Sequence, residues 1–257
     1  MNYHLLPVVR VFVSMADLAG GRLTLAGDTA RHLGGALRVR PGEELVAVSE
    51  DGIEHTCRVV AASAREVVAD VIRSRPSRAE PGRAIRVCQA LLKGDQFERI
   101  LEYGSELGVS SFQPMLTERT VARPDAGKLR NRMDRWRQVC RQGAELARRG
   151  RIPEVLEPAS LAVALDNANR DGLVTYLLYE GESLPSLSSV MNTSSPCCLV
   201  VGPEGGWSEA EVMLARQAGA QPVSLGPRIM RPLPAVLAAV AVALDRSRDL
   251  DLPPLEQ

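Results

Sequence analysis

The chain lacks any long uninterrupted apolar stretch. No run in its 257 residues approaches the roughly 18 apolar residues that a membrane-spanning helix needs. Its first residues, Met1-Asn2-Tyr3-His4, also lack the basic and then apolar order of a secretory signal. These absences predict a soluble, cytoplasmic protein with no membrane partner.

Metal-ligating residues are also scarce. The three histidines contain no pair at helical spacing, and the five cysteines are odd in number and contain no C-x-x-C motif. Most of the cysteines lie inside apolar runs, which favours buried thiols over metal ligands. We therefore expect no metal site.

The chain also lacks a net charge, because 31 Lys and Arg balance 31 Asp and Glu. The charge is nevertheless uneven, and residues 119–151 hold eleven lysines and arginines against three acidic residues. A solvated helical face would explain such a segment. A polyanion-binding surface would explain in addition why the rest of the chain is correspondingly acidic.

Short strands separated by turn residues dominate the amino-terminal part of the chain. The predicted strands are 8–13, 23–25, 44–48, 55–61 and 67–72. Asp28 is the expected capping residue of one short helix that interrupts them. The pattern predicts a small β-barrel domain over residues 1–76, followed by a linker rich in proline and charge.

Strands alternate with helices in the second predicted domain, residues 82–250. The expected strands are 85–92, 109–115, 173–179 and 197–201. This alternation predicts an α/β fold with a parallel sheet covered on both faces.

Two helices of this domain have clear sequence signals. Asp95 with Glu98 predicts a capping box at the start of one helix, and Gly108 ends it. A basic helix is expected over 128–149, where an apolar stripe leaves the arginines on the exposed side. That stripe consists of Met133, Trp136, Cys140 and Ala147.

Two glycine-rich turns follow predicted strands. The first joins the buried strand 197–201 to a helix with a capping box, Ser208 and Glu211, and the second lies within 223–234. At the carboxyl ends of parallel strands such turns bind ligands, although a tight turn without a ligand is the alternative for the first. We expect the two turns to end adjacent strands. Neither matches the dinucleotide or phosphate-loop fingerprint, which argues against a Rossmann cofactor or a nucleoside triphosphate.

These two turns resemble those of the 16S ribosomal RNA uridine-N3 methyltransferases. The turn motifs are Val201-Gly-Pro-Glu-Gly-Gly-Trp-Ser-Glu209 and Ser224-Leu-Gly-Pro-Arg-Ile-Met-Arg231. Further similar segments are Leu92-Lys-Gly-Asp-Gln-Phe-Glu98, Ser105-Glu-Leu-Gly-Val-Ser110, Pro114-Met-Leu-Thr-Glu-Arg119 and Ala36-Leu-Arg-Val-Arg-Pro-Gly-Glu43. The resemblance covers nearly the whole chain, in order.

The resemblance implies a PUA-like RNA-binding barrel followed by a SPOUT-superfamily domain with a carboxyl-terminal trefoil knot. It also implies a homodimer, the cofactor S-adenosylmethionine, and 16S rRNA or the small ribosomal subunit as substrate.

Site residues follow from the resemblance by position, except for the phosphate contacts, which we expect from the basic segment. The residues expected to bind the methyl donor, S-adenosylmethionine, are Leu178, Glu180, Gly202, Gly205, Leu225, Gly226 and Ile229. For Leu178, Leu225 and Ile229, packing in the core is the alternative to contact with the cofactor. Arg231 is the expected catalytic residue, because a cation could stabilise the uridine anion that forms when N3 loses its proton. Arg10 and Arg38 could act in the same way or bind RNA, and Arg123, Arg137, Arg141 and Arg149 are expected to contact phosphates.

Two departures from the family pattern concern the expected active site. Pro232-Leu-Pro234 removes a hydroxyl and a carboxylate from the predicted knot loop, and Glu145-Leu-Ala147 replaces Glu-Gln-Ser. They leave open a second interpretation, an RNA-binding protein with the knot fold but weakened or lost catalysis. A third, an unrelated α/β enzyme with a small substrate, would not explain the basic segment.

Overall fold

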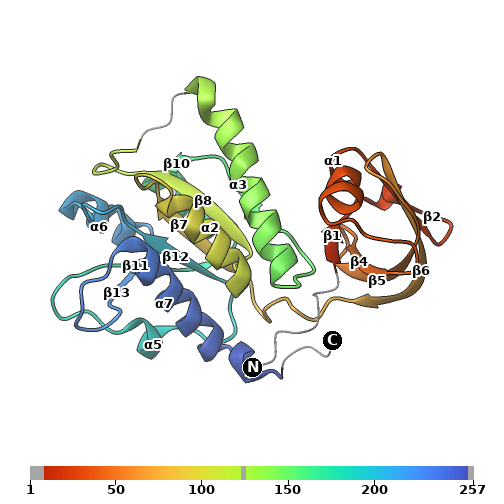
Figure 1. Ribbon diagram of the computed structural model, residues 1–257. Helices are drawn as coiled ribbons and strands as arrows, with labels where there is room; N and C mark the ends of the chain where they lie inside the picture. The colour runs from red at the N-terminus through yellow and green to blue at the C-terminus, as the bar shows by residue number, and fades with distance from the viewer. Residues whose placement is uncertain (1–8, 123–125, 254–257) are drawn as a thin grey trace. The chain divides into compact units, whose positions relative to one another are not determined.

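The structure is a computed structural model that describes residues 9–122 and 126–253 (Figure 1). It separates into two compact units. Residues up to Glu80 form the first unit together with Arg148–Arg151, and Pro81–Ala147 and Ile152 onward form the second. Nothing in the local sequence pattern had indicated that a segment after the basic helix returns to the first unit.

The first unit is built on a six-stranded sheet with the order β1-β4-β5-β6-β3-β2. Its strands are β1 (Val9–Phe12), β2 (Leu18–Ala19), β3 (Arg22–Ala26), β4 (Glu44–Val48), β5 (Ile53–Ala62) and β6 (Glu66–Pro76). Alternate side chains such as Leu23, Leu25 and Leu45 enter one apolar core. Among the described residues no ladder joins β1 to β2, so the predicted barrel stays open along that line.

Three short helical segments accompany this sheet: η1 (Met15–Asp17), α1 (Gly27–Ala30) and η2 (Arg31–Ala36). The predicted capping role of Asp28 is wrong, because Ala26 is the N-cap residue of α1. The carboxylate of Asp28 pairs instead with Arg31, three residues further along.

The second unit contains a seven-stranded sheet with the order β10-β8-β7-β12-β11-β13 and β9 beside β8. Its strands are β7 (Ile85–Ala90), β8 (Ser111–Leu116), β9 (Glu154–Val155), β10 (Ala159–Ser160), β11 (Val174–Leu178), β12 (Cys197–Val201) and β13 (Gln221–Val223). Every pairing in this sheet is parallel, as predicted.

Helices cover both faces of this sheet, which explains its apolar strands. On β12, Leu199 and Val201 pack into the cluster formed with α2 (Gln96–Leu107), α3 (Ala126–Leu146), α5 (Leu187–Val190) and α7 (Pro232–Arg246). Cys198 and Val200 belong to the opposite cluster, formed with α4 (Leu161–Arg170) and α6 (Glu209–Gln217). A short segment, η3 (Asp249–Asp251), follows α7.

The helix ends match the sequence signals only in part. Gly108 ends α2 in the left-handed region (φ 105°), as predicted. The capping box at Asp95 is wrong, because its side chain makes no cap bond and binds Arg99 at 2.9 Å instead. The capping box of α6 is confirmed: Ser208 accepts from the Glu211 N–H, and Glu211 accepts from the Ser208 N–H.

The apolar stripe of α3 is largely confirmed. Met133, Trp136 and Cys140 are buried, and Trp136 packs against Phe97 with ring centroids 4.7 Å apart. Ala147 lies beyond the end of the helix. All five cysteines are buried free thiols, in agreement with their positions in apolar runs. No helix in residues 9–122 and 126–253 has the length and apolar character for a membrane span.

Candidate active site

A cavity of about 960 Å³ lies at the carboxyl ends of β11, β12 and β13. Its walls come mainly from residues 178–181, 201–207 and 223–232. All eight residues predicted for donor binding and catalysis line it, namely Leu178, Glu180, Gly202, Gly205, Leu225, Gly226, Ile229 and Arg231. The fold therefore brings together residues that are up to 53 positions apart in the sequence.

The prediction that the two glycine-rich turns end adjacent strands is wrong. β11 lies between β12 and β13, so three strand ends build the cavity. Leu178 and Tyr179 connect the two turns: the Trp207 indole N–H donates to the Leu178 carbonyl at 2.9 Å, and the Tyr179 N–H donates to the Val223 carbonyl at 3.0 Å. The order of strands depends on long-range pairing, which local motifs do not encode.

The glycines of the first turn meet different requirements. Gly206 has φ 69°, a conformation that favours glycine. A Cβ atom on Gly202 would lie 3.0 Å from the Trp207 ring, and one on Gly205 would lie 3.2 Å from Cβ of Arg119. A side chain at Gly205 would therefore require Arg119 to shift, whereas no positive φ favours glycine at this position.

The second turn is held by Ser224, whose hydroxyl accepts from the Gly226 N–H at 3.0 Å. Gly226 has φ 101°. Further along, the side chain of Ile229 is 83% exposed, although it is apolar. An apolar group in this position is available to a ligand or to another chain.

Arg231 lies directly before α7 and is its N-cap residue, without a side-chain cap bond. Pro232 and Pro234, which we expected in a loop, lie in the first turn of this helix. Proline is well tolerated there, because the first N–H groups of a helix have no intrahelical partner. The hydroxyl and carboxylate side chains that the family pattern predicts, and that Pro232-Leu-Pro234 replaces, would thus lie at the start of α7.

Charged groups of both signs line the cavity. Arg119 and Arg228 join Arg231 as cations, and Glu180 and Glu204 are the carboxylates. Such a set can bind a zwitterionic ligand, while the neighbouring leucines offer an apolar surface.

Arg119 also lines the cavity, although no role was predicted for it from the sequence. It lies within the segment Pro114–Arg119 that resembles a family motif, which is the signal that could have identified it. Its guanidinium donates to the Gly205 carbonyl at 2.9 Å. The buried Gln89 was likewise missed; its amide donates to the Gly202 carbonyl at 3.1 Å.

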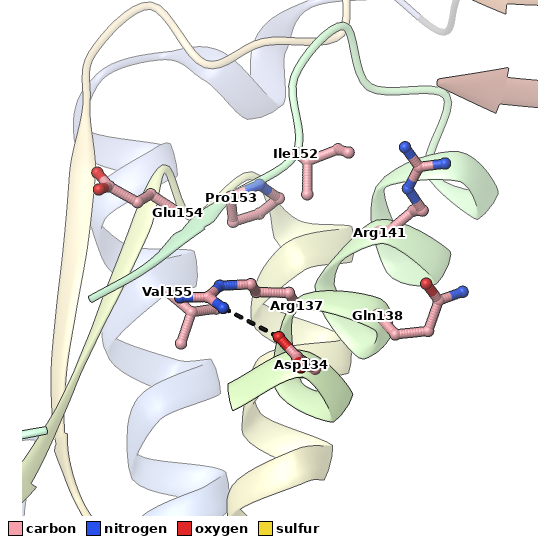
Figure 2. Close-up of a pocket in the computed structure, with 8 residues that line it drawn as sticks. All are labelled: Asp134, Arg137, Gln138, Arg141, Ile152, Pro153, Glu154 and Val155. Carbon is pink, nitrogen blue, oxygen red and sulfur yellow. Dashed lines mark hydrogen bonds and ion pairs between the residues drawn. The ribbon is translucent and has the colours of Figure 1, made fainter. Parts of the chain in front are cut away.

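Two of the arginines expected to bind phosphate lie together on α3. Arg137 and Arg141 line a recess of about 440 Å³ opposite residues 152–155 (Figure 2). The side chain of Arg137 is 51% exposed and binds Asp134 at 3.1 Å, and that of Arg141 is 34% exposed. Both remain accessible to a polyanion.

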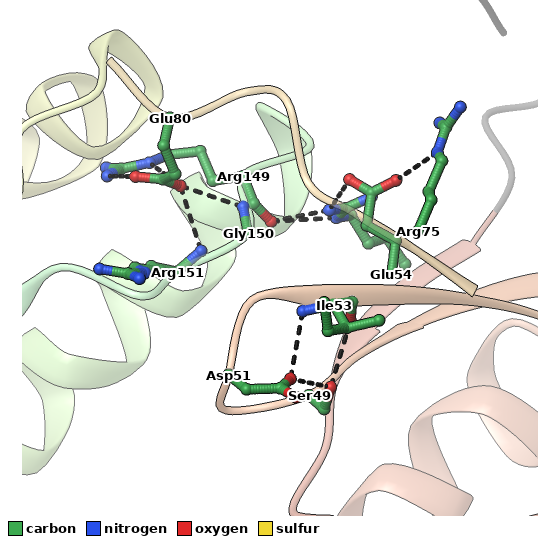
Figure 3. A network of polar contacts seen from close by, with 10 residues as sticks. Ser49, Asp51, Ile53, Glu54, Arg75, Glu80, Arg149, Gly150 and Arg151 are labelled. Carbon is green, nitrogen blue, oxygen red and sulfur yellow. Dashed lines mark hydrogen bonds and ion pairs between the residues drawn. The ribbon is translucent and has the colours of Figure 1, made fainter. Parts of the chain in front are cut away.

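Arg149 and Arg10 do not fit their predicted contacts with RNA. Arg149 belongs to the first unit, where its guanidinium donates to Glu80 at 2.7 and 3.2 Å and its side chain is 2% exposed (Figure 3). Arg10 donates to Glu54 at 2.8 Å and to the Arg149 carbonyl, with its side chain 8% exposed. Both guanidinium groups thus have internal partners and little contact with solvent.

The other two predicted RNA-binding residues differ from these. Arg38 is exposed and adopts the left-handed region (φ 54°), which places a cation on the surface of the first unit. Arg123 lies outside the described residues.

Comparison with known families matches both parts of the chain. The RNA methyltransferase domain family matches residues 79–244, and the RNA methyltransferase PUA domain family matches residues 25–72. A parallel-sheet methyltransferase domain preceded by a PUA domain defines the class of this protein.

Individual relatives narrow that class. The ribosomal RNA small subunit methyltransferase E of Mycobacterium bovis is 32% identical, over 91% of this chain and 88% of the relative. The crystal structure of the enzyme of that name from Neisseria gonorrhoeae, bound to S-adenosylmethionine, is 31% identical with a TM-score of 0.83, covering 91% of this chain and 96% of that one. A structure from Legionella pneumophila with bound S-adenosylmethionine is 26% identical, with a TM-score of 0.85 over 93% and 97% of the two chains. The chain belongs to the ribosomal RNA small subunit methyltransferase E family.

Proposed function

We propose that this protein transfers a methyl group from S-adenosylmethionine to N3 of a uridine in 16S rRNA of the small ribosomal subunit. The observation that carries the proposal is the convergence of all eight predicted site residues on one cavity at the strand ends. The names of the relatives and the S-adenosylmethionine in the Neisseria gonorrhoeae structure support it. We further propose that the protein acts in the cytoplasm as a homodimer with a knotted SPOUT domain, residues 82–250, after an RNA-binding domain, residues 1–76.

The cavity residues fit this cofactor. Leu178, Leu225 and Ile229 offer apolar contacts for an adenine ring. A Cβ atom added to Gly226 would meet no atom within 4 Å, so the space beside this turn is open. The carboxylate of Glu180 suits a positively charged amino or sulfonium group, and the arginines suit a carboxylate.

The cofactor, when bound, supplies an electrophilic methyl group. This chain's own residues must then favour loss of the uridine N3 proton and hold the base in line for attack. We assign Arg231 the role of stabilising the negative charge on the base, because this arginine lines the cavity and its side chain makes no cap bond with α7.

The alternative function is RNA binding without catalysis. It is favoured by Pro232 and Pro234, which leave the start of α7 without a hydroxyl or carboxylate side chain. Under this alternative the donor cavity would persist, but transfer would be slow or absent.

Arg231→Ala tests the catalytic assignment against this alternative. We expect the wild-type protein to bind S-adenosylmethionine in calorimetry and to methylate 16S rRNA. In the variant, donor affinity should change little, while the transfer rate should fall roughly 100- to 1,000-fold, the range for loss of one charge-stabilising group. Donor binding without transfer in the wild type would support the RNA-binding alternative, and absence of donor binding would refute the proposed function.

A further inference from the structure

A hydrogen-bonded turn follows β8 and carries Arg119 to the cavity. The Thr117 N–H donates to the Thr120 hydroxyl at 3.0 Å, and the two threonine hydroxyls lie 2.7 Å apart. Both threonines are 4% exposed, so the base of this turn is buried. Arg119 itself is exposed, and its side chain lines the cavity.

Arg119 contacts Gly205 in two ways. Its guanidinium donates to the Gly205 carbonyl at 2.9 Å, and its Cβ lies 3.2 Å from the position that a Cβ on Gly205 would occupy. The stem of the side chain therefore packs against the backbone of the glycine while the head group holds its carbonyl oxygen.

A carboxylate fastens the same two segments at a second point. One oxygen of Glu211 accepts from the Glu118 N–H at 2.8 Å, and the other accepts from the Ser208 N–H at 3.0 Å. Gln89, which is 1% exposed, holds the Gly202 carbonyl from the end of β7. Side chains from two neighbouring strand ends thus fix carbonyls near both ends of the glycine-rich turn.

We propose that Arg119 is a positioning residue for the donor: it holds the Gly205 carbonyl so that the turn is in its binding conformation before the donor arrives. The inference rests on the proposed function. A hydrogen bond from a charged group to a carbonyl is stronger than one from a neutral group. Fixing a binding loop before the ligand arrives also removes the entropy cost of ordering that loop on binding. Because Arg119 is exposed and has no part in the core, its loss should affect the turn rather than the fold.

Arg119→Ala is the direct test, with methyl transfer and calorimetry on the full chain. We expect the Kd and KM for S-adenosylmethionine to rise roughly tenfold or more, the consequence of losing one charged hydrogen bond. The melting temperature, the KM for RNA and kcat at saturating donor should stay close to wild type. Arg170→Ala is the matched control, because Arg170 is an exposed arginine on α4 that binds Asp166 and Asn167 on its own helix, away from the cavity residues.

A double-mutant cycle with Gly205→Ala tests the interaction itself. The added methyl group would press on Arg119, so each single variant should disturb the same hydrogen bond. Donor affinity in the double variant should therefore fall by less than the product of the two single effects. Independent, multiplicative effects would contradict the proposed interaction.

Other results would overturn the inference. An unchanged donor Kd with a raised KM for RNA would assign Arg119 to substrate binding, and a fall in melting temperature that accounts for the weaker donor binding would assign it to general stability. If the wild-type protein bound no donor, the proposed function would fail together with the inference. If the wild type and Arg119→Ala bound the donor equally, only the inference would fail.

Discussion

Gly205 and Gly206 are neighbours in the sequence, but the structure uses them for different reasons. Gly206 has a positive φ with no heavy atom within 4 Å of an added Cβ, whereas Gly205 has Arg119 at 3.2 Å. The sequence pattern predicts that both lie in a ligand-binding turn. It could not distinguish their roles, because Arg119 lies 86 positions away from Gly205 in the chain.

Replacing each glycine should separate affinity from stability. Gly205→Val should displace Arg119 and weaken binding of S-adenosylmethionine strongly, while the protein remains folded. Gly206→Ala should reduce the free energy of unfolding by about 1 to 2 kcal/mol, because the left-handed region is unfavourable for alanine. Calorimetric affinity and melting temperature, measured on both variants, check the two effects. Normal donor affinity in folded Gly205→Val would show that this turn is not part of the donor site.

Glu54 is the centre of a buried ion-pair cluster in the first unit. Its carboxylate accepts from Arg10 at 2.8 Å and from Arg75 at 3.1 Å, and its side chain is 6% exposed. Figure 3 shows the contact between Glu54 and Arg75. Burial by itself would raise the pKa of Glu54, but hydrogen bonding and the charge of Arg10, with help from Arg75, outweigh it and lower the pKa below its ordinary value of 4.5.

A lowered pKa in the folded state predicts a definite dependence of stability on pH. The contribution of Glu54 is present above its unfolded pKa and is lost as the pH falls through the lower, folded pKa. Thermal melts of the wild type and Glu54→Gln should therefore differ near neutral pH, and the difference should begin to shrink below about pH 4.5 and disappear once the pH is below the lowered, folded pKa. Glu50→Gln, at an exposed position, is the control. A difference in melting temperature that does not shrink in acid would contradict this role.

At the scale of elements, the positions of the strands were easier to predict than the order of the strands in the sheet or the side-chain caps of the helices. The predicted strand 197–201 coincides with β12 because five consecutive buried residues can hardly form a surface loop. The position of β11 between β12 and β13 follows from pairing across the sheet, which leaves no local signal. Asp95 is the N-cap residue of α2 by position, as predicted, but its side chain makes no capping box because its carboxylate binds Arg99.

The basic helix α3 illustrates both the reach and the limit of charge patterns. Its apolar stripe correctly placed arginines on the exposed side. The pattern could not show that Arg149, just beyond the helix, binds Glu80, which is 69 positions away. A positively charged segment therefore predicts an exposed, phosphate-binding surface only after the arginines with internal carboxylate partners have been identified and set aside.

Neutralising Arg137 and Arg141 together should weaken binding of 16S rRNA. If each arginine binds one phosphate, the salt dependence of log Kd should become less steep by roughly 0.7 to 0.9 for each phosphate that is no longer neutralised. Filter binding over a range of salt concentrations measures this slope for Arg137→Gln/Arg141→Gln. Arg216→Gln, at an exposed position on α6, is the control. An unchanged slope would assign both arginines to ordinary solvation and to their ion pairs, Arg137 with Asp134 at 3.1 Å and Arg141 with Glu145 at 3.9 Å.

At the scale of the whole molecule, the class of each unit could be read from the sequence, but the connection between them could not. Alternating strands and helices with apolar strands dictate a parallel sheet covered on both faces. The return of Arg148–Arg151 to the first unit depends on Glu80, whose carboxylate also accepts from the Gly150 and Arg151 N–H groups. An interaction of this kind has no periodicity by which it could be recognised.

The apolar surface of helix α7 suggests that the protein forms an oligomer. One face, which includes Val236, Val240 and Leu244, is fully buried. Other positions around the helix are also apolar but only half-buried, namely Leu233, Leu237, Ala238, Ala241 and Val242. A helix that is apolar all round normally lies inside a protein or an interface.

We therefore expect a homodimer in which this second face of α7 is covered by another copy of the chain. Light scattering at micromolar concentration should give twice the mass of one chain, and Leu237→Glu should give a single chain, because a charge would then have to be buried in the interface. Val163→Glu, which places the same charge at an exposed apolar position on α4, should remain dimeric. If the dimer completes the donor site, Leu237→Glu should also bind S-adenosylmethionine more weakly while its helical content is retained. A wild-type protein with the mass of one chain and full donor affinity would refute the dimer, and the half-buried face of α7 would then need another partner.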